Sequence, residues 1–277
     1  MAIKLICIDM DGTLLSDHHQ VHPKNLEAIK TVTALGVKVA IATGRIFASA
    51  KIYCELIGVK TPIISANGGY IRYGDTVMAE HNMGYENCKK IVEVLEKFKS
   101  VYYLYTEDSM ITNADIPETH PYKSMNNQLS EKDRLKFYHY DNINDAVENH
   151  GDKIIKCIVM EENFEEIQKI REDINKIQGL EVVSSYTNNI EMMAAGVTKG
   201  KAAEALAKHY GFSRDEVMCI GDSENDLSMI TYAGLGVAMG NGNEAVKKAA
   251  KYITDTNVNG GVGKAIEKFV IEPMTKN

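Results

Sequence analysis

The sequence predicts an α/β protein whose core is a parallel β-sheet. Three short apolar runs, at Ile3–Ile8, Val37–Ala42 and Pro62–Ala66, have the nearly continuous hydrophobic pattern of strands that are covered on both faces. A helical pattern between the first two runs ends at Gly36. Strands that alternate with helices in this way are typical of a parallel sheet.

The same alternation returns in the last third of the chain. A helix is predicted from Lys199 to Tyr210, where Gly211 ends it, and it is followed by further elements of the same kind. These are a strand at Val217–Ile220, a helix at Glu224–Tyr232, a strand at Leu235–Ala238 and helices near 243–250 and 261–270. The core sheet is therefore predicted to form from two separate parts of the chain.

Between these parts the pattern changes. Two strands around Gly74-Asp75 predict a β-hairpin, and three more strands are predicted at 101–106, 154–160 and 180–185, with helices at 85–99 and 163–176. The intervening stretch from 108 to 152 is rich in polar residues. We predict an inserted α/β domain at 83–188, with the core domain formed by 1–82 and 189–277.

Composition limits the kinds of partner and compartment. The 277 residues suffice for two domains, and 31 Lys and Arg against 38 Asp and Glu give a net charge of -7, which disfavours nucleic acid as a partner. No apolar run approaches the roughly 20 residues that span a bilayer. Five widely spaced cysteines without a CxxC pair indicate reduced thiols. A cytoplasmic protein, a monomer or small homo-oligomer, is expected.

Acidic residues follow two of the predicted core strands. Asp9 and Asp11 come directly after the first strand, and in an extended backbone their side chains would share a face. A second cluster, Gly221-Asp222-Ser223-Glu224-Asn225-Asp226, follows the strand that ends at Ile220. Loops after the carboxyl ends of parallel strands line the ligand crevice. Two such clusters would repel each other unless a cation lay between them, and hard oxygen ligands suit Mg²⁺.

Basic and hydroxyl side chains occur where an anion could bind. Thr198 is predicted to cap the helix that begins at Lys199, a position where the helix dipole disfavours a cation by about 0.3 to 1 kcal/mol. A lysine there indicates an anion to neutralise, although a solvated lysine is an equally simple explanation. The Thr43 hydroxyl and the Gly44 and Arg45 amides, at the start of another helix, would suit a phosphate.

Together these segments resemble the four motifs of haloacid dehalogenase-like phosphatases, in order and spacing. The detail is similar to the Cof-type, sugar-phosphatase-like subfamily, in segments that include Ile64-Ser65-Ala66-Asn67-Gly68-Gly69 and Gly196-Val197-Thr198-Lys199-Gly200. The resemblance implies a Rossmann-like parallel-sheet core with an inserted α/β cap. The interval between Thr43 and Lys199 is where such a cap belongs.

The resemblance also implies a role for each motif residue. Asp9 would attack phosphorus and form an aspartyl-phosphate, and Asp11 would act as acid and then as base. Mg²⁺ would be held by Asp9, the Asp11 carbonyl and Asp222, with Asp226 in support. The phosphoryl oxygens would be held by Met10, Thr43, Gly44, Lys199 and Asn225.

The function predicted from these residues is hydrolysis of small phosphate monoesters, such as sugar phosphates or related metabolites. Two alternatives stay open: a phosphomutase that uses the same aspartyl-phosphate, and a protein that senses a phosphorylated metabolite without turnover. The cap would meet the leaving group, and the segment Asp108–Pro121 is a candidate for that contact.

Overall fold

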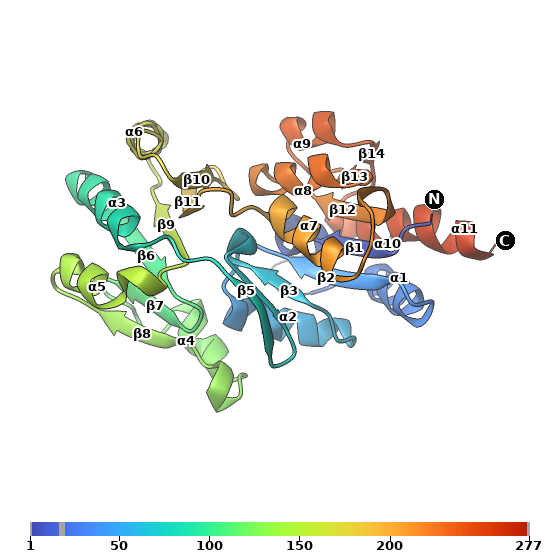
Figure 1. The fold of residues 1–277 in the computed structure, drawn as a ribbon, viewed down its shortest axis with the longest axis horizontal. Coiled ribbons are helices and arrows are strands. Elements are labelled where there is room, and N and C mark those ends of the chain that lie inside the picture. Colours follow the sequence, from blue (N-terminus) through green and yellow to red (C-terminus); the bar gives the residue numbers. More distant parts are fainter. Residues whose placement is uncertain (1, 17–19, 276–277) are drawn as a thin grey trace.

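Two β-sheets organise the chain into a core domain and a cap (Figure 1). The structure is a computed structural model that describes residues 2–16 and 20–275. The cap comprises everything from helix α3 to strand β11, residues 85–194, and the core domain contains the segments before and after it. Both termini lie on the core domain, at the end away from the cap (Figure 1).

The core sheet has the strand order β14-β13-β12-β1-β2-β3-β4-β5. The pairs from β14 to β3 are parallel, and β4 and β5 form an antiparallel hairpin at one edge. This confirms the predicted parallel sheet. Its strands are β1 (Leu5–Ile8), β2 (Lys38–Ala42), β3 (Ile63–Ser65), β4 (Tyr70–Tyr73), β5 (Thr76–Glu80), β12 (Val217–Gly221), β13 (Leu235–Ala238) and β14 (Tyr252–Ile253).

Helices cover both faces of this sheet, as its apolar strands require. One face packs against α1 (Pro23–Ala34), α2 (Phe47–Ile57) and α10 (Gly261–Ile266). The other packs against α7 (Lys199–His209), α8 (Leu227–Tyr232) and α9 (Glu244–Ala249), and the short α11 (Glu272–Thr275) lies near the C-terminus. The Thr198 hydroxyl accepts a hydrogen bond from the Lys201 amide at 3.1 Å, which confirms the predicted cap of α7.

Strand register brings the polar loops together at one edge. Ile8, the last residue of β1, is paired with Ile220 of β12 on one side and with Ile41 of β2 on the other. Because the three strands are parallel, the residues that follow them leave the sheet at the same edge. Asp9, Thr43 and the acidic segment after Gly221 are therefore neighbours.

The cap sheet has the order β10-β11-β9-β6-β7-β8, antiparallel except for the parallel pair β7 and β8. Its strands are β6 (Val101–Tyr105), β7 (Ser109–Thr112), β8 (Lys136–His139), β9 (Lys156–Met160), β10 (Leu180–Val183) and β11 (Asn189–Ala194). Its helices are α3 (Tyr85–Phe98), α4 (Pro121–Asn126), α5 (Ile143–His150) and α6 (Phe164–Ile174). The inserted second sheet was predicted, and it is mixed.

The two faces of the cap sheet serve different purposes, since successive side chains of a strand point to opposite faces. Tyr102 and Leu104 of β6 belong to the apolar cluster formed with α3, α5 and α6. Tyr103 and Tyr105 belong to the other face, in a second apolar cluster that includes Ile46 and Ala48 of the core domain. The cap sheet is thus packed between its own helices and the core domain.

The structure differs from the sequence-based prediction in the middle of the cap. The polar stretch from 108 to 152 contains β7, β8, α4 and α5, none of which was predicted, because they are short and their apolar residues are few. Strand β11 pairs with β9 and β10, so the chain leaves the cap sheet after Ala194. The predicted return to the core domain, at residue 189, falls at the start of this cap strand.

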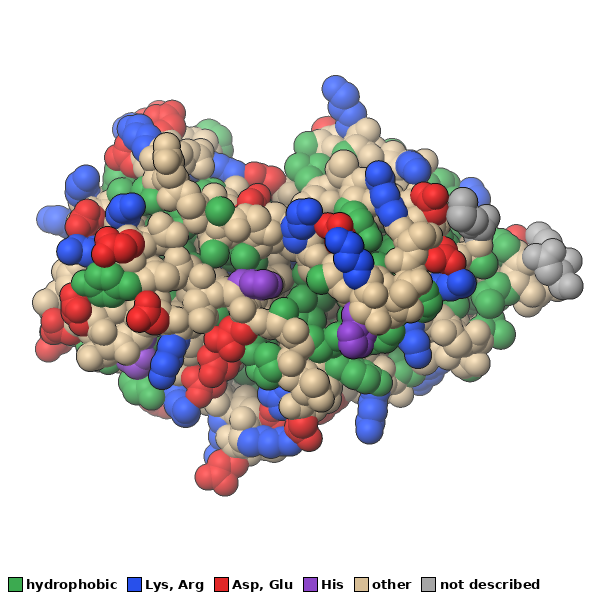
Figure 2. All heavy atoms as spheres, viewed as in Figure 1, with side chains coloured by type: hydrophobic (Ala, Val, Ile, Leu, Met, Phe, Trp, Pro, Cys, Tyr) green, Lys and Arg blue, Asp and Glu red, His purple; other side chains and the backbone are tan. Residues whose placement is uncertain are grey.

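Other features of the described residues bear on compartment and partners. All five cysteines are buried and unbonded, as the prediction of reduced thiols requires. The helices within residues 2–16 and 20–275 are too short or too polar to cross a bilayer. On the face in Figure 2, basic and acidic side chains are interspersed.

Burial in β6 leads to a first prediction. Leu104→Ala should destabilise the cap by about 2 to 5 kcal/mol, because the buried side chain leaves a cavity. The matched control is Val101→Ala in the same strand, where the side chain is 44% exposed and about 0.5 kcal/mol is expected. Urea unfolding followed by circular dichroism measures both. Equal losses for the two variants would contradict the assigned faces of β6.

Candidate active site

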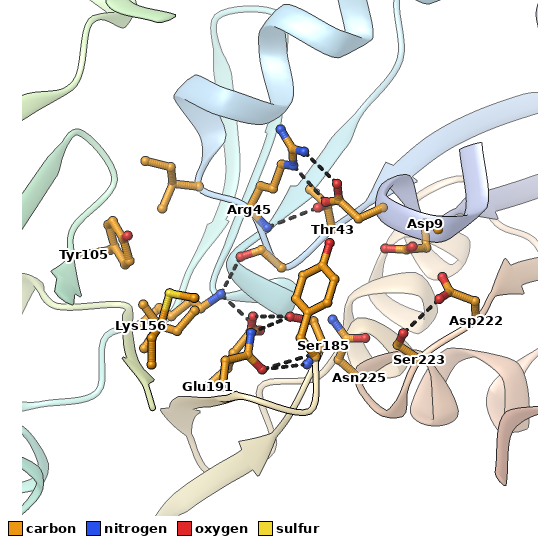
Figure 3. A pocket seen from close by; sticks show the side chains of 18 of the residues that line it. Asp9, Thr43, Arg45, Tyr105, Lys156, Ser185, Glu191, Asp222, Ser223 and Asn225 are labelled. Carbon is orange, nitrogen blue, oxygen red and sulfur yellow. Dashed lines mark hydrogen bonds and ion pairs between the residues drawn. The ribbon is translucent and has the colours of Figure 1, made fainter. Parts of the chain in front are cut away.

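A cavity of about 480 Å³ lies between the carboxyl edge of the core sheet and the cap. Figure 3 shows that side chains from both domains line it. The core domain contributes Asp9, Asp11, Gly12, Thr43, Gly44, Arg45, Ile46, Tyr53, Asp222, Ser223 and Asn225. The cap contributes Tyr105, Pro121, Tyr122, Lys156, Ile158, Met160, Ser185, Tyr186, Asn189 and Glu191.

Three carboxylates converge at the end of the cavity nearest the sheet. Asp9, Asp222 and Asp226 each have an oxygen within 4.8 Å of the others. The fully buried Lys199 donates hydrogen bonds from Nζ to Asp9 Oδ1 at 2.6 Å and to Asp226 Oδ1 at 2.7 Å. The second oxygen of Asp226 accepts the backbone amides of Asp222 and Ser223, which fixes the loop after β12.

The electrostatics of this cluster favour an additional cation. Burial, followed by the charge of Asp226, raises the pKa of Asp9 well above its usual range, and Lys199 only partly opposes this. Burial and Asp226 raise the pKa of Asp222 to about 6, against hydrogen bonds from Thr13 and Ser223. Burial disfavours the charge of Lys199, but Asp226 and Asp9 outweigh it and raise the Lys199 pKa. One lysine does not neutralise three carboxylates.

The segment after Asp9 is a turn and not the continuous extended chain that was predicted, although Asp9 and Asp11 themselves keep extended backbone angles. Met10–Leu14 forms one wide helical turn whose backbone is non-helical at Asp11 and at Gly12, where φ is 76°. A Cβ at Gly12 would lie 2.6 Å from Asp222 Oδ2, so both the backbone conformation and the space require glycine. Thr13 donates a hydrogen bond to Asp222 Oδ1 at 2.7 Å. The turn therefore joins the first acidic segment to the second.

Asp11 lines the same cavity as Asp9 but is held by another partner. Arg45 donates to both carboxylate oxygens of Asp11, from Nε at 2.8 Å and from Nη2 at 2.6 Å. The guanidinium group lies 4.4 Å above the Tyr53 ring. The Arg45 amide also donates to the Thr43 hydroxyl at 3.1 Å. A bidentate pair of this kind fixes the orientation of the Asp11 carboxylate.

The other residues predicted for the site differ in whether their side chains line the cavity. Thr43, Gly44 and Asn225 line the cavity. Lys199 and Asp226 are behind Asp9 and outside that lining. The Met10 side chain is packed in the apolar core of the sheet, so a contact with phosphate would involve its backbone amide.

Lys156 and Glu191 are part of the cavity wall but were absent from the predicted site. Lys156 begins the strand β9, whose other residues are apolar, and Glu191 lies among the apolar residues of β11. A charged residue next to apolar strand residues is the signal that could have identified them. Of the candidate segment Asp108–Pro121, Pro121 lines the cavity. Three tyrosines of the cap, Tyr105, Tyr122 and Tyr186, are also in the wall.

Comparisons with known proteins agree with this geometry. A model of the haloacid dehalogenase-like hydrolase family matches residues 6–266. The chain is 33% identical over 269 residues to a 5-amino-6-(5-phospho-D-ribitylamino)uracil phosphatase of Bacillus subtilis (strain 168), with 97% of this chain and 96% of the relative covered.

Solved structures lead to the same family. A haloacid dehalogenase-like hydrolase from B. subtilis superposes with a TM-score of 0.85 at 27% identity, over 97% of this chain and 100% of that one. A subclass IIB sugar phosphatase of the same superfamily superposes with a TM-score of 0.77 at 25% identity, over 96% and 98% of the two chains.

The chain therefore belongs to the haloacid dehalogenase-like hydrolase family. Within that superfamily it is a phosphatase of the Cof-type, subclass IIB group, a phosphoric monoester hydrolase.

The buried lysine provides a second prediction. Lys199→Met should lower the free energy of unfolding by about 3 to 5 kcal/mol in metal-free buffer, because the two buried carboxylates of Asp9 and Asp226 lose their cation. The control is Lys201→Met on the same helix, where the side chain is 70% exposed and a loss below about 1 kcal/mol is expected. Guanidinium denaturation measures both. A Lys199→Met protein as stable as the control would refute the assigned electrostatics.

Proposed function

We propose that this protein hydrolyses small phosphate monoesters in a Mg²⁺-dependent reaction that proceeds through an aspartyl-phosphate on Asp9. The observation that carries the proposal is the convergence of Asp9, Asp222 and Asp226 around a buried lysine, at the end of a cavity that the cap covers. The catalytic domain, 1–82 with the segment after the cap, would supply the chemistry, and the cap would supply recognition.

The donor set fits magnesium. Three carboxylates offer hard oxygen ligands within 4.8 Å of one another. Burial and the charge of Asp226 raise the pKa values of Asp9 and Asp222, and a bound cation would oppose both effects. We infer that Asp9, the Asp11 carbonyl and Asp222 hold the ion, with Asp226 in support. When bound, Mg²⁺ would neutralise charge on the phosphoryl group and orient it.

Asp9 is the group placed to attack phosphorus. It leaves the sheet at the cavity, and Lys199 holds its Oδ1, so we infer that Oδ2 acts as the nucleophile. We infer that Thr43, Gly44 and Asn225, together with Lys199 and the Met10 amide, bind the phosphoryl oxygens.

Asp11 is the group placed to transfer the proton. Both of its oxygens are held by Arg45 on the cavity wall, so its position is set before substrate binds. It would protonate the leaving oxygen and then remove a proton from the water that hydrolyses the aspartyl-phosphate. A binding protein without turnover would have no need of this second carboxylate.

The substrate is proposed to be a sugar phosphate or a related phosphorylated metabolite. The cavity wall formed by the cap combines aromatic rings, Tyr105, Tyr122 and Tyr186, with polar groups such as Asn189. Such a wall suits a leaving group with both hydrophobic faces and hydroxyl groups. The relatives named above act on a ribitylaminouracil phosphate and on sugar phosphates.

Free, buried cysteines support a reducing compartment such as the cytoplasm.

The nucleophile gives the third prediction. Asp9→Asn should lower the rate of phosphate release from p-nitrophenyl phosphate by at least about a thousandfold, because the amide cannot form the covalent intermediate. Asp11→Asn should lose about 10² to 10⁴-fold, since the acid and base are removed but the nucleophile remains. Retained turnover in Asp9→Asn would overturn the mechanism.

Stoichiometric release of free phosphate, without a bisphosphate activator, distinguishes hydrolysis from a mutase reaction.

Metal removal gives the fourth prediction. EDTA should abolish phosphate release, and added Mg²⁺ should restore it and raise the melting temperature by mass action. Asp222→Asn should need at least about tenfold more Mg²⁺ for half-maximal activity, because a ligand is lost. Asp215→Asn, an exposed residue on the same domain, is the control and should match the wild type. Full activity in EDTA would contradict the metal site.

A further inference from the structure

A buried ion pair in the cap lies directly against the residues proposed to bind phosphate. Lys156 and Glu191 have side chains that are only 4% and 3% exposed, and Lys156 Nζ is 3.0 Å from Glu191 Oε2. Glu191 is paired with Ile158 across the sheet, and Lys156 is two residues from Ile158, so the two charged side chains share the face toward the core domain.

Lys156 reaches the phosphate-binding loop of the core domain. Its Nζ donates a hydrogen bond to the Gly44 carbonyl oxygen at 2.6 Å. Gly44 itself has no room for a side chain, because a Cβ there would lie 2.9 Å from Glu191 Oε2. The absence of a side chain at Gly44 is thus what allows the pair from the cap to approach the loop.

Glu191 reaches the other phosphate-binding element through Asn67. Asn67 donates from Nδ2 to Glu191 Oε2 at 2.5 Å and accepts from Asn225 Nδ2 at 3.1 Å. The Asn67 backbone has a left-handed conformation, φ 54°, and its amide donates to the Thr43 carbonyl at 3.0 Å. A single core residue therefore connects the Glu191 carboxylate to both Asn225 and Thr43.

The charge of the pair matters because an anion binds next to it. Glu191 alone would place a buried negative charge beside Gly44 and repel a phosphate. Lys156 balances that charge, and Ser185 satisfies the remaining oxygen of Glu191 at 2.9 Å. The pair can contact the anion site because it is neutral as a unit and both side chains have hydrogen-bond partners.

We propose that Lys156 and Glu191 are positioning residues that the cap brings to the active site. In the closed arrangement the pair fixes Gly44 directly and Asn225 through Asn67, so that the phosphate site is complete only when the cap is in place. If the cap moved away, the two charges would remain together in the cap sheet, and Gly44 and Asn67 would lose the hydrogen bonds that they make to the cap. This inference rests on the proposed function, which assigns Gly44 and Asn225 to the phosphoryl group.

A second ion pair between the cap and the core domain provides the control. Asp133, in a short turn of the cap, is paired with Lys51 of α2 and lies 3.4 Å from Arg72. This contact also joins the two domains, but its partners are not those of the Lys156–Glu191 pair. A residue that only holds the cap in place should behave like Asp133.

The test measures inorganic phosphate as a competitive inhibitor of p-nitrophenyl phosphate hydrolysis in Mg²⁺. Lys156→Met should weaken phosphate inhibition by about 10- to 100-fold, because it leaves Glu191 unbalanced. The double variant K156M/E191Q should recover about tenfold of this loss, since neutrality is restored. Glu191→Gln should lower kcat more than it weakens phosphate binding. Asp133→Asn should change the inhibition by less than about threefold.

The outcomes separate the two proposals. Equal weakening of phosphate inhibition in Lys156→Met and Asp133→Asn, or no recovery in the double variant, would overturn the positioning role. Calorimetric titration with phosphate and Mg²⁺ gives the same comparison without turnover. If the wild type binds phosphate but releases none from any ester, the proposed function is wrong. If the wild type and Lys156→Met bind phosphate with equal affinity, only the positioning role is wrong.

Discussion

The contact between Lys199 and two buried carboxylates is the interaction on which the rest of the active site depends. It joins Asp9, at the end of β1, to Asp226, after β12, and so connects the two parts of the chain that the cap separates in sequence. Three carboxylates with one lysine remain short of positive charge. That shortage is a stability cost that a divalent cation would relieve, and it links the fold of the core sheet to the proposed metal.

The two sheets divide the work of the protein. The parallel sheet presents its reactive groups on loops at one edge, where Asp9, Asp11 and Asp222 are fixed by Lys199, Arg45 and Thr13. The cap sheet instead presents one whole face, because alternate side chains of β6, β9 and β11 point to the core domain. The proposed chemistry and the proposed recognition thus depend on different geometric properties of strands.

The sequence was sufficient for the parts of the structure that depend on local pattern. Apolar runs that end in polar residues predicted β1, β2 and β12, and Thr198 predicted the start of α7. Short elements such as β7 and β8 were missed because their pairing is decided by contacts within the cap and not by a periodic pattern. The partners of Asp11 and Gly44 were likewise unpredictable, since Arg45 meets Asp11 only after the core sheet has formed, and Lys156 meets Gly44 only after the cap has packed on the core domain.

The buried cysteines have a practical consequence. Burial raises the pKa of Cys54 and Cys88 to about 12, and the remaining three thiols are fully buried. Thiolates are the reactive form, so the folded protein should react slowly with maleimide dyes. A pair of cysteines introduced at exposed sites, one on each domain, could therefore be labelled selectively, and fluorescence energy transfer between the dyes would follow the distance between cap and core domain in single molecules.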